Sequence, residues 1–171
     1  MIYPLATRLR VITDAGDRTP NLVRQVITVT GIGDNVATPL FTVTTSNEGG
    51  SADGGAYVCQ VSALVAHGGT PATSNAAAKG FQARFSRAMT GGGSGALSAV
   101  SEDHDDTAAD TDAAARSIGN VTLTVAETSE YVITASITVD LTGTGVDTAE
   151  VTAVVEVLWT GFLTRPTIAP A

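Results

Sequence analysis

A stretch of alternating residues near the C-terminal end constrains the fold more than any other feature. In EYVITASITVDL (130–141) apolar side chains alternate with mostly polar ones. Successive side chains of a β-strand point to opposite faces, so this pattern predicts a strand with one buried and one exposed face. The residues expected on the buried face are Tyr131, Ile133, Ala135, Ile137, Val139 and Leu141.

Further segments carry strand signals. Residues 121–125 repeat the alternation, and residues 151–162 are partly apolar on both faces, as in a central strand of a sandwich. Thr and Val are frequent throughout, and their branched Cβ atoms fit a pleated sheet. The other predicted strands are 25–30, 39–45, 56–67 and 80–89, with 9–13 as a weaker candidate.

Glycine-rich clusters, such as 53–55 and 91–95, separate these segments and predict loops. A ten-residue helical pattern, which a parallel α/β fold would need between strands, is missing. We therefore predict an all-β fold, namely a single antiparallel β-sandwich or jelly roll with extended arms. The predicted parts are an N-terminal arm at 1–24, the sandwich domain at 25–163 and an extended C-terminal tail at 164–171.

Composition excludes several classes of protein. The single cysteine excludes an intrachain disulfide framework and zinc sites of the Cys₄ or Cys₂His₂ kind. A net charge of −8, from 17 acids against 9 Lys and Arg, disfavours nucleic acid as a partner. Apolar runs are too short for a membrane span, and MIYPLATRLR lacks the apolar core of a secretory signal. We therefore expect a soluble, acidic protein made in a reducing compartment.

The acids are concentrated in residues 101–112, which hold six of them and no base. Because like charges repel at this density, we expect an exposed acidic loop there. Three roles are open for it: a solvated loop, a weak cation site without the EF-hand pattern, or a contact with a basic patch such as the arm of a neighbouring copy. The candidate contact residues are Glu102, Asp103, Asp105 and Asp106.

The N-terminal arm is basic and partly apolar, with four arginines against Asp14 and Asp17. Its apolar side chains either fold back on the sheet or reach a neighbouring subunit. In the second case the arm binds a partner. The candidate partner-contact residues are Ile2, Tyr3, Leu5, Arg8, Arg10, Arg18 and Arg24.

Catalytic motifs are weak. The run 91–95 lacks the Gly-Lys-Ser/Thr of a phosphate-binding loop, and GSG at 93–95 lacks the strand-to-helix context of a nucleophile elbow. His67 and His104, with one cysteine, are too few for a converging zinc site. We expect no enzyme activity, no cofactor and no metal site, although the sequence leaves open a carboxylate pair of the kind that cleaves glycosidic bonds.

Four side chains in predicted strands are expected in the core. Cys59 lies mid-strand in phase with apolar neighbours, as a small buried hydrophobe does. Phe81 and Phe85 share one face of the strand at 80–89. For Trp159, in the last strong strand, we expect a core position, and stacking against a sugar is the alternative.

Several of these features together resemble the β-sandwich module of tailed-bacteriophage virion proteins, found in fibres, spikes and head decoration proteins. They are an Asp-Gly-Gly turn, a long strand ending in small residues, a Phe-x-Ala-x-Phe strand, and closing hairpins with Thr-Gly turns. The chain departs from the family in its acidic 101–112 segment and in lacking a long fibrous repeat. The stretches that carry the resemblance are TSNEGGSADGGAYVCQVSALVA (45–66), GFQARFSRAM (80–89), IGNVTLTVAETSEYVITASITV (118–139) and TAEVTAVVEVLW (148–159).

The resemblance implies a jelly-roll-like, non-enzymatic virion protein that is made in the host cytoplasm and forms a homotrimer. Its partners would be the major capsid protein or other virion proteins. One domain with an arm at each end suits a capsid decoration (cement) protein that straps neighbouring capsomers of the head lattice. A head spike, short fibre or tail component binding a host glycan or receptor is the alternative within the family. A non-viral β-sandwich binding module is the alternative outside it.

Overall fold

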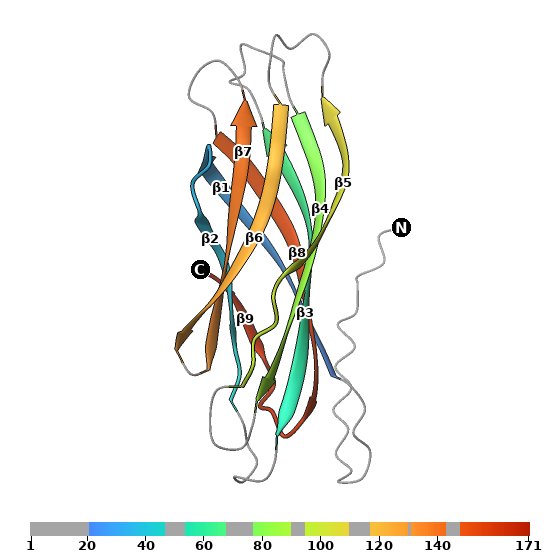
Figure 1. The fold of residues 1–171 in the computed structure, drawn as a ribbon, viewed down its shortest axis with the longest axis vertical. Helices are drawn as coiled ribbons and strands as arrows, with labels where there is room; N and C mark the ends of the chain where they lie inside the picture. The colour runs from blue at the N-terminus through green and yellow to red at the C-terminus, as the bar shows by residue number, and fades with distance from the viewer. Residues whose placement is uncertain are drawn as a thin grey trace, which may run out of the picture.

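Two antiparallel sheets pack face to face in the computed structural model of the chain (Figure 1). The structure describes residues 21–46, 54–67, 77–89, 95–109, 117–129, 131–142 and 148–171. Within these ranges it has nine strands and no helix, which confirms the predicted all-β sandwich. The strands are β1 (Asn21–Gly33), β2 (Thr38–Thr44), β3 (Gly55–His67), β4 (Ala77–Met89), β5 (Ser101–Ala109), β6 (Ser117–Ser129), β7 (Val132–Thr142), β8 (Thr148–Gly161) and β9 (Thr167–Pro170).

One sheet has five strands, in the order β1-β8-β3-β4-β5, and the other has four, in the order β6-β7-β2-β9. Strands β3, β4 and β5 follow one another along the chain, whereas β8 returns to lie between β1 and β3. Strand β3 pairs along its whole length, from Gly55 to His67, with β4 on one side and β8 on the other. It is therefore the central strand of the five-stranded sheet, and β1 and β5 are the edges.

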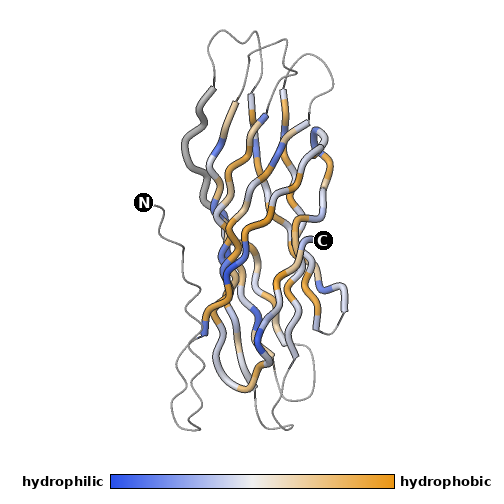
Figure 2. The backbone as a smooth tube through the Cα atoms, turned by 180° about the vertical axis from the view of Figure 1, so that it is seen from behind, coloured by the Kyte–Doolittle hydropathy of each residue, from blue (hydrophilic) through white to orange (hydrophobic). Residues whose placement is uncertain are grey.

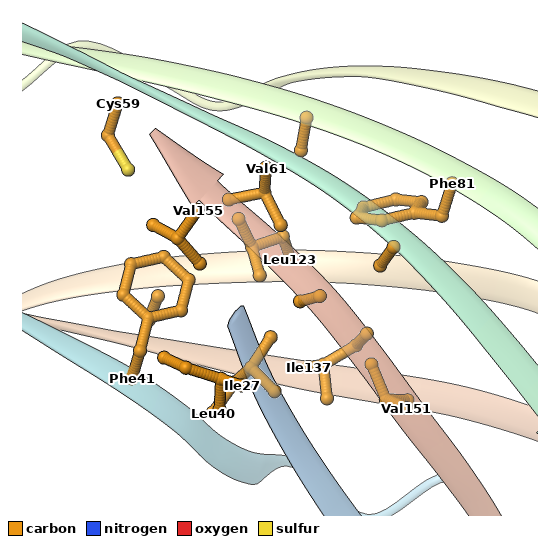
Figure 3. Packing of buried hydrophobic residues seen from close by; sticks show 14 of the residues in the cluster. Ile27, Leu40, Phe41, Cys59, Val61, Phe81, Leu123, Ile137, Val151 and Val155 are labelled. Carbon is orange, nitrogen blue, oxygen red and sulfur yellow. The ribbon is translucent and has the colours of Figure 1, made fainter. Parts of the chain in front are cut away.

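The core lies between the sheets and is built from alternate residues of each strand. Figure 3 shows side chains from both sheets meeting there, among them Phe41 from β2 and Val61 from β3. Hydrophobic residues recur at short intervals along both sheets in Figure 2. The alternation predicted for 130–141 is wrong only at Tyr131, which precedes β7 and is 38% exposed. The buried residues of this set are Ile133, Ala135, Ile137, Val139 and Leu141.

The side chains expected in the core are found there. Cys59, Phe81 and Phe85 are buried between the sheets. Trp159 is only 7% exposed and belongs to the same hydrophobic cluster. Its indole face is therefore covered by protein, which confirms the core position and leaves no exposed platform for a sugar at this residue.

Both ends of the predicted domain need adjustment. Strand β1 begins at Asn21, so Arg24 belongs to the sheet and not to an arm. The segment 164–171 is not a free tail, because β9 pairs with β2. Proline is tolerated in such an edge strand, since one side of it makes no ladder hydrogen bonds. The rest of the predicted arm and the weaker strand at 9–13 lie outside the described residues.

Candidate functional site

Of the seven residues predicted to contact a partner through the arm, the structure describes one, Arg24. It lies on β1, with its side chain on the outer face of the five-stranded sheet. Its Nε atom is 3.5 Å from Oε1 of Glu156 on β8. Arg24 is therefore part of a sheet face. The residues outside the described ranges, whose role stays a prediction, are Ile2, Tyr3, Leu5, Arg8, Arg10 and Arg18.

The acidic segment is a strand where we predicted a loop, up to the last residue described in it, Ala109. It forms β5 and pairs with β4. The backbone of this segment pairs with the edge of β4 through ladder hydrogen bonds, and the like charges in its sequence do not prevent this pairing. Oε1 of Glu102 accepts a hydrogen bond from the backbone N of Leu123 on β6, at 2.6 Å, and so ties the two sheets together. The other acidic candidates on this edge strand are Asp103, Asp105 and Asp106.

The outer face of the five-stranded sheet carries an apolar surface that our sequence analysis missed. Of the eight large hydrophobic side chains exposed among the described residues, five lie on this face. Leu22 pairs with Leu158, and Leu158 pairs with Val58, so these three stand in one row across β1, β8 and β3. Val26 on β1 and Leu64 on β3 lie further along the same face, beyond the row of residues that begins at Arg24. We call these five residues the outer apolar face.

A row of charged and polar side chains crosses the same face of the sheet. Arg24 pairs with Glu156, Glu156 with Gln60, and Gln60 with Arg84, so the row runs from β1 to β4. At the end near β4 and β5 the surface has a hollow of about 370 Å³. Its lining residues are Gln60, Gln82, Ala83, Arg84, Ser101 and Glu102. A broad sheet face with a charged row and a polar hollow suits recognition of another protein surface better than enclosure of a small molecule.

A buried charge lies at the end of the sandwich where β4 and β6 finish. The side chain of Arg87 on β4 has no exposed surface, and its Nη2 atom is 2.5 Å from Oε1 of Glu127 on β6. Tyr57 on β3, the pairing neighbour of Arg87, is also buried and meets the ring of Phe85 edge to face at 6.5 Å. Burial raises the pKa of Tyr57 to about 12, although the nearby guanidinium of Arg87 opposes that shift. The ion pair joins the two sheets from inside.

We expect the protein to lose stability in alkaline solution between pH 10 and about pH 12. Unfolded tyrosine ionises near pH 10, whereas folded Tyr57 keeps its proton to about pH 12, so base favours the unfolded state. The loss amounts to about 2 to 3 kcal/mol at the upper end of this range. Urea unfolding at a series of pH values measures it in the wild type and in Tyr57→Phe. The variant should lose less, and an equal loss in both proteins would contradict this prediction.

The side chains considered for catalysis are not brought together. Cys59 is buried, and burial raises the pKa of its thiol, so the reactive thiolate is disfavoured. His67 on β3 and His104 on β5 are separated by β4. Within the described residues no group of three His, Cys, Asp or Glu side chains is placed to hold a metal ion. The same part of the chain has no helix long and apolar enough to cross a membrane.

Comparison with known proteins adds no relative. No protein-family model matches this sequence, and the searches of curated proteins and of solved structures returned no match.

Proposed function

We propose that this chain is a non-enzymatic structural protein of a bacteriophage virion, and specifically a capsid decoration (cement) protein that binds the head lattice. The outer apolar face is the observation that carries the proposal. Five large apolar side chains on one sheet face are typical of a protein that works in contact with another protein. A net charge of −8 keeps such a protein soluble until that surface is covered.

The energetic logic is that of linkage. A protein that binds only the assembled shell stabilises the shell by mass action, and the effect is repeated at every lattice site. A small sandwich with long, fully paired strands offers a rigid surface that loses little conformational entropy on binding. The partners are the major capsid protein or other virion proteins, and the chain is made in the host cytoplasm before assembly.

The test is reconstitution on expanded capsids of the phage that encodes this chain, prepared without the chain. We expect the purified protein to pellet with these capsids through a sucrose cushion and to raise their melting temperature. Leu64→Asp places a charge on the outer apolar face and should lower the bound amount at least tenfold. Deleting residues 1–20, which leaves β1 whole, should also weaken binding if the arm straps the lattice.

Thr124→Asp is the control, because it adds the same charge to an exposed position of β6 in the other sheet. It should bind capsids as the wild type does. A wild-type protein that stays in the supernatant would overturn the proposal. Binding to tails, or to a glycan array, would instead support the spike, fibre or tail alternative, and binding to neither would leave the non-viral binding module.

A further inference from the structure

We infer that a second copy of this chain covers the outer apolar face, with the two five-stranded sheets packed face to face about a two-fold axis that runs along β3. The inference rests on the proposed function in taking this face to be a contact surface: a second copy covers it in the free protein and is displaced by the lattice when the chain binds a capsid. It predicts a dimer in solution, in place of the homotrimer that the phage resemblance implies.

The size of the face fits a stable contact between two copies. Strands β3 and β4 have 13 residues each, and a strand rises about 3.3 Å per residue, so the sheet is about 40 Å long. Five strands spaced about 4.8 Å apart make it about 20 Å wide. The resulting area of about 800 Å² per copy is what a standard protein interface buries. Two sandwiches stacked in this way would bury the outer apolar face of each copy together with the row from Arg24 to Arg84.

The charged row selects the two-fold arrangement. A two-fold axis along β3 places β8 of one copy over β4 of the other, because these strands flank β3 on opposite sides. Glu156 and Arg84 occupy the same row, since both pair with Gln60. Each copy would then set its Glu156 opposite the partner copy's arginine at position 84, twice in the dimer. Face-to-face packing centred on β8 would instead bring the two Glu156 carboxylates together.

The hollow in the surface lies where the partner copy's carboxylate would arrive. It is lined by Arg84 and by the amides of Gln60 and Gln82, which supply donors for a carboxylate. Glu102 also lines the hollow, but its Oε1 already accepts the hydrogen bond from Leu123. Each copy therefore presents both a hollow with donor groups and a carboxylate, Glu156 on β8, that would fit the hollow of the other copy.

The two edges of the five-stranded sheet are less suited to binding a second copy than its outer face is. Strand β5 is one edge, and its sequence contains Glu102 and three aspartates. Charges on an edge strand are a common means of preventing another strand from adding to it. The opposite edge, β1, lies beside β9 of the other sheet. Among the described residues, the outer face then offers a second copy five of the eight large exposed hydrophobic side chains.

Sedimentation velocity across a concentration series tests the inference through reciprocal charge variants. We expect the wild type to reach twice the 17.3 kDa chain mass. Arg84→Glu and Glu156→Arg each place like charges opposite one another at both contacts, so each variant alone should dimerise at least tenfold more weakly. Mixing the two variants pairs glutamate with arginine at both contacts, and the mixture should dimerise again. Thr124→Glu, on the other sheet, should behave as the wild type.

A wild type that stays monomeric, or forms a trimer, would overturn the inference. So would a dimer that the single charge variants leave intact, or variants that do not associate when mixed, because both results place the contact elsewhere. Thermal melts of each variant verify that it is folded, and all three substituted positions are solvent-accessible. A wild type that is monomeric in solution and still binds capsids would overturn this inference alone, whereas a dimer that does not bind capsids would overturn the proposed function alone.

Discussion

Replacing Trp159 by Ala is expected to lower the free energy of unfolding by about 3 to 5 kcal/mol. Trp159 is the largest side chain of the core cluster and is only 7% exposed, so its removal leaves a cavity between the sheets. It stands on β8 between Asn21 of β1 and Tyr57 of β3, where neighbouring strands prevent collapse of the site. Urea denaturation measures the loss, and a melting scan should show a fall of roughly 10 °C.

Thr160→Ala is the control for this variant, because Thr160 is the next residue of β8 and points outward. Its effect should stay within about 0.5 kcal/mol. The same pair of variants separates the two roles weighed for the tryptophan. If Trp159→Ala kept its full stability and instead lost binding to glycans, the indole would act as a sugar platform and its core role would be wrong.

Alternation was sufficient to predict most of the strands. Each segment predicted between residues 25 and 162 overlaps an observed strand, because burial on one face imposes a period of two that is visible in the sequence. Strand β5 was missed since its letters, SEDHDDTAA, show charge and no apolar period. It forms because β4 offers an unpaired edge, and that edge exists only once the sheet has assembled. Strand β9 was missed for the related reason that its partner β2 is distant in sequence.

The candidate site was harder to predict than the fold. The outer apolar face is formed by residues such as Val26, Val58 and Leu158, which come from three strands and adjoin only through the order β1-β8-β3. Alternation marks each of them as outward, but strand order is not encoded in any one segment. Arg87 did carry a usable signal, since the period of Phe81 and Phe85 places it on the inward face. An arginine in phase with core residues predicts a buried ion pair. The structure is needed only to identify Glu127 as the acidic residue of that pair.

The second large loss of stability is expected from breaking the ion pair between Arg87 and Glu127. The side chain of Arg87 is fully buried, and the carboxylate of Glu127 is 32% exposed. Removing the carboxylate takes a charged hydrogen-bond partner away from a cation that is buried inside the sandwich, which costs far more than the loss of a surface salt bridge. We expect Glu127→Ala to lower the free energy of unfolding by about 3 kcal/mol. Urea denaturation near neutral pH measures it, and Thr128→Ala, at the next and exposed position of β6, is the control.

A double variant distinguishes the loss of a charged partner from simple loss of packing. Arg87→Met replaces the buried cation with an apolar chain of similar length, and a buried ion pair exchanged for apolar residues is often neutral in stability. The double variant Arg87→Met, Glu127→Ala should therefore be more stable than Glu127→Ala alone, by about 2 kcal/mol. If the double variant were instead less stable than either single variant, the pair would stabilise the fold through hydrogen bonds that Met cannot replace. That outcome would show that the guanidinium, rather than the volume it fills, holds the ends of β4 and β6 together.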